Sequence, residues 1–300
     1  MALLNLLKQL TYGQCAPIQP EPDKAEETRM AEMRDLEGRK ALVTGSATGL
    51  GRSIAVKLAE RGADVIVNCT RSIADAEATV AACQTAGAQA RLVQADVSTD
   101  EGCRKLAEAA AQAGRLDILV NNAGITKHAR DHADLDALSR EDFLHTYAVN
   151  VAGPFLMMQA CKPLLVESFN QTGRAATVLN TSSIAGVTGI GSSIAYAATK
   201  GALNTMTLSL ARALAPAIRV NAICPGFIGT RWFKDEMSAE QYERMEASVA
   251  AAVPLNVARG PDDIADSALF FLSDASRHVT GETLLVDAGM HLGYAPLSAR

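Results

Sequence analysis

The stretch Ala41-Leu-Val-Thr-Gly45-Ser-Ala-Thr-Gly49-Leu-Gly51 leads into a segment rich in Ala, Leu and Ile that continues to Arg61. Its first residues are typical of a buried strand, and the segment after Gly51 is typical of a helix. Glycine between a strand and a helix permits a tight turn and lets peptide N–H groups approach a pyrophosphate. Three glycines in one turn are weak evidence alone, but here the strand and helix that the motif requires flank it. We therefore predict a dinucleotide-binding turn.

The alternation of apolar runs and helical segments continues along the chain. The expected strands cover residues 41–43, 64–68, 91–94, 116–120, 177–181, 219–224 and 283–286. Helical segments separate them, including a long one over 139–168 and another over 196–213. This spacing predicts an α/β domain with a doubly wound (Rossmann) parallel sheet of seven strands and helices on both faces.

Tyr196 and Lys200 stand four residues apart in one of these helices, so both side chains project from one face. A phenol titrates near pH ~10, and an ammonium beside it favours the phenolate. We expect Lys200 to lower the pKa of Tyr196 by roughly 2–3 units, which would let the phenol give a proton to a carbonyl oxygen as hydride arrives at carbon. Ser183 follows strand 177–181, at the carboxyl edge where open α/β proteins bind ligands. Taken alone, the Tyr–Lys spacing also fits a solvated helix face.

The residues after the second expected strand bear on the choice of cofactor. An NAD site usually has a carboxylate about 20 residues after the glycine turn, but Asn68-Cys-Thr-Arg-Ser72 contains none. Arg71 can pair with a 2′-phosphate, with hydroxyls from Thr70 and Ser46. The alternative is a solvated arginine at a helix start. We predict NADP(H) rather than NAD(H).

Composition limits the partners of this 300-residue chain. The net charge is −5 with no basic block, which argues against nucleic acid. No run reaches the ~20 apolar residues that span a membrane. The six cysteines show no metal-ligand spacing and no secretory signal precedes them, which favours a reducing, cytoplasmic compartment. His128 and His132 lie among charged residues, so we expect a solvated loop and no metal site.

Residues 1–36 differ from the rest of the chain. Leu3, Leu6, Leu7 and Leu10 fall on one helical face, and prolines and a charged run follow. This composition predicts a partly ordered arm or linker over 1–36 and a catalytic domain over 37–300. Our hypothesis is that the leucine face docks on the protein itself or on a partner subunit.

Five motifs in order resemble the short-chain dehydrogenase/reductase family in its single-domain form. They are Thr44-Gly-x-x-x-Gly49-x-Gly51, Asn121-Asn-Ala-Gly124, Asn150-Val-Ala-Gly153, Ser183 with Tyr196-x-x-x-Lys200, and Pro225-Gly226. The resemblance covers about Leu36 to Leu292. Within the family it is similar to 3-oxoacyl-[acyl-carrier-protein] reductases, through Asn-Ala-Gly-Ile-Thr126 and the Asn68 to Ser72 stretch.

The resemblance implies catalytic roles for four residues. Tyr196 would be the general acid (base in oxidation) and Lys200 would lower its pKa and hold the nicotinamide ribose. Ser183 would orient the carbonyl, with Ser182 as its rival, and Asn150 would anchor a water that leads to the lysine. The cofactor-binding set that we predict is Gly45, Ser46, Thr48, Gly49, Leu50, Gly51, Thr70, Arg71, Ser72, Asp96, Val97, Asn122, Ala123, Gly124, Tyr196, Lys200, Pro225, Gly226, Ile228 and Thr230.

The substrate side is expected to be apolar, under a lid at about 227–253. The side chains predicted there are Ile125, Ile184, Val187, Ile190, Phe227, Trp232, Phe233 and Met237, with Trp232 and Phe233 equally suited to packing. The predicted function is NADPH-dependent interconversion of a small-molecule ketone and a secondary alcohol. The alternatives are a 3-oxoacyl-[acyl-carrier-protein] reductase of fatty-acid or polyketide synthesis, and a non-catalytic nucleotide-binding protein. The resemblance also implies a homo-oligomer, a tetramer or a dimer.

Overall fold

The computed structural model describes residues 34–129, 131–230, 237–258 and 260–293. The chain divides into two compact units, Met1–Arg34 and Asp35–Arg300, and the predicted arm lies almost entirely outside the described residues. Leu36, which we had placed in the arm, is fully buried, and its N–H donates to the carbonyl oxygen of Arg61. The larger unit therefore begins two residues before the boundary expected from the sequence.

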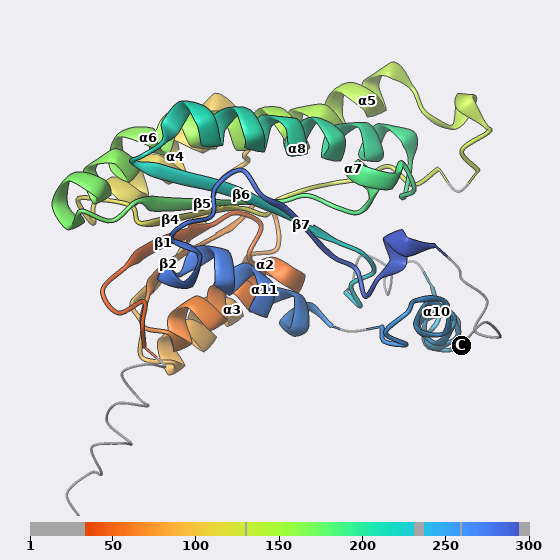
Figure 1. The fold of residues 1–300 in the computed structure, drawn as a ribbon, viewed down its shortest axis with the longest axis horizontal. Helices are drawn as coiled ribbons and strands as arrows, with labels where there is room; N and C mark the ends of the chain where they lie inside the picture. Colours follow the sequence, from red (N-terminus) through yellow and green to blue (C-terminus); the bar gives the residue numbers. More distant parts are fainter. Residues whose placement is uncertain (1–33, 130, 231–236, 259, 294–300) are drawn as a thin grey trace, which may run out of the picture. The chain divides into compact units, whose positions relative to one another are not determined.

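A seven-stranded parallel sheet forms the centre of the larger unit, as predicted (Figure 1). Its order is β3-β2-β1-β4-β5-β6-β7, so the chain runs outward from β1 in one direction and then, from β4 on, in the other. The strands are β1 Lys40–Val43, β2 Asp64–Cys69, β3 Ala90–Gln94, β4 Ile118–Asn121, β5 Ala176–Thr181, β6 Ile218–Pro225 and β7 Thr283–Val286. In such a sheet a ligand site forms at the carboxyl ends, where β1 and β4 diverge.

Helices cover both faces of the sheet (Figure 1). One layer is α2 Gly49–Glu60, α3 Ile73–Thr85 and α11 Pro261–Leu272, and the other is α4 Asp100–Ala111, α6 Gly153–Thr172 and α8 Ile194–Leu214. The helices outside these two layers are α5 Arg140–Tyr147, α7 Ala185–Thr188 and α10 Ala239–Ala252, with 3-10 turns at Leu135–Ala137, Asp274–Ser276 and Met290–Leu292. Helices α7 and α10 lie at the carboxyl edge of the sheet.

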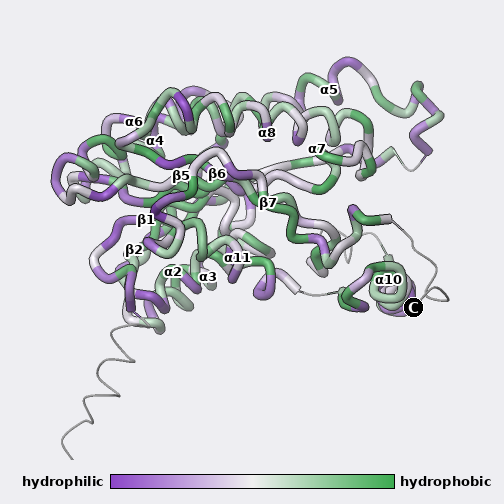
Figure 2. Tube along the Cα trace, viewed as in Figure 1, coloured by the Kyte–Doolittle hydropathy of each residue, from purple (hydrophilic) through white to green (hydrophobic). Residues whose placement is uncertain are grey.

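The core consists of two apolar clusters, one on each side of the sheet. The hydropathy colouring shows apolar residues concentrated along the strands and the helix faces that meet them (Figure 2). Strands β1 and β4 are almost wholly buried, because both of their faces lie under helices. Small Ala and Val side chains let these helices approach the sheet closely.

The long helix expected over 139–168 differs in one respect. It starts at Arg140 but contains a π-helical turn, Ala148–Ala152, before α6 continues to Thr172. Pro154, just after this turn, lacks the N–H that an α-helix would direct at the carbonyl oxygen of Asn150. π-helical turns often occur at functional sites, and this one contains a predicted site residue.

The combined helix Arg140–Thr172 is the one described segment that by length and composition is apolar enough to cross a membrane. Half of its most apolar window is buried inside the domain. Its buried residues, which include Met157, Cys161 and Leu165, belong to the core cluster shared with α4 and β5. The helix therefore serves as a core helix of this fold.

Candidate active site

A cavity of about 720 Å³ lies at the carboxyl edge of the sheet. It is lined by the turn after β1, the loops after β2, β3, β4, β5 and β6, and residues of α10 and the Met290–Leu292 turn. The predicted site residues that line it are Gly45, Thr48, Gly49, Leu50, Thr70, Arg71, Ser72, Asp96, Val97, Asn122, Ala123, Gly124, Ser183, Tyr196, Lys200, Pro225, Gly226, Ile228 and Thr230. The fold thus brings most of the predicted residues to one cavity.

The glycine turn fits a dinucleotide phosphate. Gly45 and Gly49 have φ angles of 60° and 58°, a backbone region that favours glycine. A Cβ on Gly45 would lie 2.8 Å from the Cα of Ala123, so no larger side chain fits between β1 and β4. The N-cap of α2, Thr48, makes no side-chain capping hydrogen bond, and the first turn of the helix carries no acidic residue. The free N–H groups at this helix start therefore suit an anion.

Two residues predicted to bind the cofactor, Ser46 and Gly51, do not line the cavity and instead support the glycine turn from inside the protein. The Ser46 hydroxyl donates to the carbonyl oxygen of Val43 (2.7 Å) and accepts from the N–H of Asn68 (3.0 Å). The expectation that Ser46 offers this hydroxyl to a 2′-phosphate was wrong, because the side chain is fully buried and both bonds lie within the protein. A Cβ on Gly51 would lie 2.4 Å from Nδ2 of Asn122, so this glycine permits close helix packing rather than lining the cavity.

Tyr196 and Ser183 meet at the wall of the cavity. Tyr196 is in the first turn of α8, whose N-cap Ser193 accepts from the N–H of Tyr196 (3.1 Å). The Ser183 hydroxyl accepts from the N–H of Ala185 (3.1 Å), which fixes it at the start of α7. The two side chains share a hydrogen bond, so both hydroxyls can address one substrate oxygen.

Ser182, the rival by one residue, points elsewhere. Its hydroxyl donates to the carbonyl oxygen of Lys200 (3.1 Å) and is buried. The geometry therefore favours Ser183 as the partner of the phenol.

The electrostatics of the pair differ from the expectation. Desolvation by the surrounding protein raises the pKa of Tyr196 to about 12, and the hydrogen bond with Ser183 offsets only part of that increase. Burial also lowers the pKa of Lys200 to about 8. The predicted lowering of the phenol pKa was thus wrong for the chain itself. The Nζ of Lys200 lies 5.5 Å from the phenol ring centroid and donates to the carbonyl oxygen of Thr181 (2.7 Å).

These values leave the phenol in its protonated state at neutral pH, which is the starting state of a general acid. The ammonium of Lys200 remains mostly charged at pH 7, because its pKa is about 8. The arrangement can therefore hold a carbonyl oxygen, give it a proton and stabilise negative charge that develops there.

Asn150 lies behind the cavity, fully buried in the π-helical turn. Its Oδ1 accepts from the N–H of Ile125, and its Nδ2 donates to the carbonyl oxygen of Ile125, both at 2.9 Å. Nδ2 also donates to Oγ1 of Thr199 (3.1 Å), which in turn donates to the carbonyl oxygen of Tyr196 (2.7 Å). Asn150 thus connects the loop after β4 to the helix that carries Tyr196 and Lys200.

The far end of the cavity, after β2, is suited to an anion. Thr70, Arg71 and Ser72 are exposed there and line the cavity. The Asn68 side chain accepts from the N–H of Gly45 and donates to strand β3 and the loop after it, so it braces the turn. Asp96 is the one acidic residue among the described residues that line the cavity.

The predicted substrate-side residues divide into three groups. Ile125, Ile184, Ile190 and Phe227 line the cavity, whereas Val187 and Met237 do not. Trp232 and Phe233 lie outside the described residues.

The residues that sequence reasoning missed include Met245, Val249, Met290 and His145. Tyr242, Met245 and Val249 have helical spacing, so the sequence indicates that they share one face of α10. It does not indicate that this face is turned toward the cavity. Met290 and His145 gave no sequence signal.

Two histidines considered as metal ligands belong to the loop after β4. His132 Nε2 lies 3.1 Å from the carbonyl oxygen of Gly191, in the wall of the cavity. Among the described residues, no three His, Cys, Asp or Glu side chains group as a metal site.

The chain is similar in sequence to known reductases over most of its length. A family model described as enoyl-(acyl carrier protein) reductase matches residues 45–291. A Streptomyces violaceoruber protein named as ketoacyl reductase 2 of the granaticin polyketide synthase is 40% identical over 253 residues, which is 84% of this chain and 96% of that one. The 3-oxoacyl-[acyl-carrier-protein] reductase FabG of Staphylococcus aureus is 36% identical over 256 residues, 85% of this chain and 98% of its own.

A solved structure of a related protein has the same fold as this chain. The Pseudomonas aeruginosa RhlG/NADP active-site complex superposes with a TM-score of 0.78 at 31% identity, and covers 86% of this chain and 98% of that one.

Proposed function

The chain belongs to the short-chain dehydrogenase/reductase family and is an oxidoreductase, and from this premise we propose that it reduces a moderately bulky, uncharged ketone with NADPH, with Tyr196 as general acid. The observation that carries the proposal is the meeting of the Tyr196 and Ser183 hydroxyls in a cavity that also contains the glycine turn. The apolar side chains of Ile184, Ile190 and Phe227 at that end favour an uncharged substrate.

The chemistry divides between cofactor and protein. When bound, the nicotinamide supplies the hydride. Ser183 orients the carbonyl, and the phenol of Tyr196 gives its proton to the oxygen as negative charge develops there. The buried ammonium of Lys200 stabilises the phenolate that remains, and Asn150 keeps the loop and helix around them in register.

We propose NADP(H) as the preferred cofactor because Arg71 offers a guanidinium at the edge of the cavity and β2 ends without a carboxylate. Arg71→Ala should lower kcat/KM with NADPH about tenfold or more and leave NADH turnover nearly unchanged. Arg104→Ala, an exposed arginine of α4, serves as the control. Equal efficiency of the wild type with NADH, or no loss in Arg71→Ala, would contradict the assignment.

The decisive experiment is a panel of carbonyl compounds followed by NADPH oxidation, with Tyr196→Phe as the blank. We expect turnover of apolar ketones by the wild type and a loss of at least about a thousandfold in kcat for Tyr196→Phe, because the phenol is the proton donor. Undiminished turnover by Tyr196→Phe would remove the phenol from the mechanism.

A second candidate is reduction of 3-oxoacyl groups on a carrier protein, which the names of two relatives favour. An acidic carrier needs a basic docking surface, but the segment after α8 reads Ala215-Pro216-Ala217. Comparing acetoacetyl thioesters with free ketones separates the candidates. Preference for the carrier-bound thioester would favour the second.

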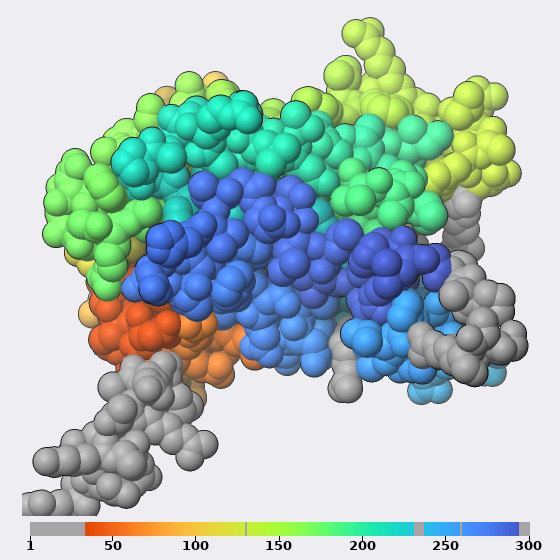
Figure 3. All heavy atoms as spheres, viewed as in Figure 1, coloured from red at the N-terminus to blue at the C-terminus, as the bar shows by residue number. Residues whose placement is uncertain are grey.

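We also propose a homo-oligomer, a tetramer or a dimer. Phe143, Leu144, Tyr147 and Phe155 are exposed on α5 and α6, and Leu208, Phe270 and Leu284 on α8, α11 and β7. The face shown in Figure 3 presents α8 (teal) above the blue segments that contain β7 and α11, with α8 and α11 on opposite faces of the sheet. Such exposed apolar faces suit subunit contacts, and size-exclusion chromatography with light scattering measures the subunit number.

We propose a cytoplasmic location. The cysteines of the described chain, at 69, 83, 103, 161 and 224, are all buried and free. Burial raises the pKa of Cys161 to about 12, which keeps its thiol protonated and inert. Free thiols without disulfides suit a reducing compartment.

A further inference from the structure

The wall of the cavity beside the catalytic phenol is a short loop, Gly189 to Ser192, between α7 and α8. Ile190, Gly191 and Ser192 line the cavity, and the Ile190 side chain is 75% exposed at its mouth. A Cβ on Gly191 would lie 2.7 Å from Cβ of Ala185 and 3.4 Å from Cδ1 of Tyr196. A side chain on Gly191 would therefore crowd Ala185 and touch the phenol ring, so the position of this glycine sets the space beside the ring.

The loop after β4 holds this wall from outside. The Thr126 and Ser192 hydroxyls are 2.6 Å apart, and the N–H of Ala129 donates to the carbonyl oxygen of Ser192 (2.9 Å). His132 adds the third contact, with Nε2 3.1 Å from the carbonyl oxygen of Gly191. Because a carbonyl oxygen only accepts, Nε2 must carry the proton that it donates to Gly191.

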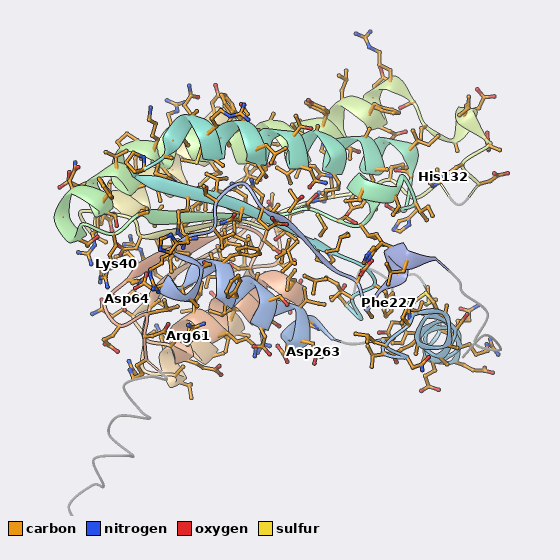
Figure 4. The ribbon with its side chains drawn as sticks, viewed as in Figure 1. Lys40, Arg61, Asp64, His132, Phe227 and Asp263 are labelled. Carbon is orange, nitrogen blue, oxygen red and sulfur yellow. The ribbon has the colours of Figure 1, made fainter. Side chains whose placement is uncertain are left out.

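His132 also lines a second cavity, of about 270 Å³, with Leu135, Leu138 and Phe143. The imidazole therefore lies between this mostly apolar space and the wall of the active site, at the end of the sheet where Phe227 also lies (Figure 4). Removing the imidazole would leave the carbonyl of Gly191 without this donor and would enlarge a space that already exists.

We infer that His132 is a positioning residue: it holds the Gly189 to Ser192 loop against the phenol ring and so fixes the shape of the substrate end of the cavity. The inference rests on the proposed function for its kinetic readout. It assigns His132 no proton transfer and no contact with the reacting atoms. Its action is through the peptide of Gly191.

The test compares His132→Ala, His132→Phe and His132→Gln in the full chain. Phe fills the volume without a donor, whereas Gln restores an N–H. For a bulky ketone we expect kcat/KM to fall about threefold to tenfold in the Ala and Phe variants, because each loses one neutral hydrogen bond. In the Gln variant kcat/KM should stay near the wild-type value. NADPH affinity should not change, since His132 does not line the site cavity.

Chemical rescue sharpens the test. Free imidazole should restore His132→Ala, because the vacated volume adjoins the second cavity, but should not restore His132→Phe, in which the ring fills that volume. One control is the wild type with added imidazole. The other is His278→Ala, which removes an exposed histidine far from this loop in the sequence. Wild-type rates in His132→Phe, or a His132→Ala variant that imidazole does not restore, would overturn the inference.

Hydrogen exchange gives a readout that needs no substrate. The N–H groups of Ala129 and Ile190, which donate to Ser192 and to the Thr188 hydroxyl, should exchange faster in His132→Ala and slow again with imidazole. If the wild type reduces no ketone, the proposed function fails, and the exchange rates alone decide whether His132 holds the loop. Unchanged exchange at both amides would overturn the inference.

Discussion

At the scale of single residues, the site is governed by desolvation. Tyr196 and Lys200 are one helical turn apart, yet their pKa values move in opposite directions, up to about 12 and down to about 8. In both cases burial penalises the charged form, and for the phenol this penalty exceeds what the hydrogen bond with Ser183 returns. The spacing in the sequence predicted the contact but not the sign of the shift, because burial is a property of the fold.

Lys200 should therefore impose a stability cost that depends on pH. Its pKa is about 8 in the folded chain against 10.5 for a free side chain. Between these values the unfolded chain binds more protons, so the stability of the folded state rises with pH. Relative to Lys200→Met, the wild type should gain about 2.5 kcal/mol in free energy of unfolding from pH 7 to pH 10.

Urea unfolding of both proteins at the two pH values measures this gain. Lys57→Met is the control: the hydrogen bond with Asp266 raises the pKa of Lys57, so this lysine stays charged in both states over the same range. A difference between wild type and Lys200→Met that is independent of pH would show that the ammonium is not desolvated.

At the scale of elements, the catalytic geometry depends on how closely α7 approaches α8. A Cβ on Gly186 of α7 would lie 2.5 Å from the carbonyl carbon of Lys200 and 2.7 Å from the N of Gly201. Only glycine fits there, because the atoms that it meets are backbone of the helix that carries Tyr196 and Lys200. A Cβ on Gly201, which faces Gly186 from α8, would find its nearest atom at 3.5 Å, an ordinary contact.

This asymmetry predicts different outcomes for two facing glycines. Gly186→Ala should push α7 away from α8, destabilise the fold by about 1–3 kcal/mol and lower kcat at least tenfold. Gly201→Ala should be neutral or stabilise by up to about 1 kcal/mol, since alanine favours the helix. Unfolding curves and steady-state kinetics of both variants test this, and equal effects of the two substitutions would refute the close approach.

At the scale of the whole molecule, the sequence predicted the sheet better than the site. Apolar runs and glycine turns located all seven strands, and the Thr283–Val286 strand exactly matches its predicted bounds because turn residues flank it on both sides. The π-helical turn at Asn150 was missed, since a helical pattern does not show where one residue is added. Ser46 was misassigned because sequence position does not show which side of the turn a hydroxyl faces, and Met290 and His145 reach the cavity only through tertiary packing.

The amino edge of the sheet, opposite the cavity, is held by a charge cluster. Arg39 precedes β1, Arg219 is the second residue of β6, and Asp274 lies in the turn after α11. The Arg39 side chain is 7% exposed, and its Nη2 lies 2.7 Å from Oδ2 of Asp274. Partial burial tends to raise the pKa of Asp274, but the hydrogen bond and charge of Arg39, with the charges of Arg174 and Arg219, lower it overall. Asp274 is therefore the carboxylate that balances a mostly buried guanidinium.

Asp274→Asn should separate stability from activity. At pH 7 we expect a loss of about 2 kcal/mol in free energy of unfolding, moderated because Asp274 is half-exposed, with kcat/KM unchanged at the opposite edge. A lowered carboxyl pKa stabilises the fold above about pH 4 and that stabilisation is lost as the pH falls further, so the difference between the two proteins should shrink in acid. Asp266→Asn, whose partner Lys57 is at the surface, should cost less than about 1 kcal/mol. If Asp274→Asn lowered kcat/KM at unchanged stability, the two edges of the sheet would be coupled, and the charge cluster would not be a purely structural part of the fold.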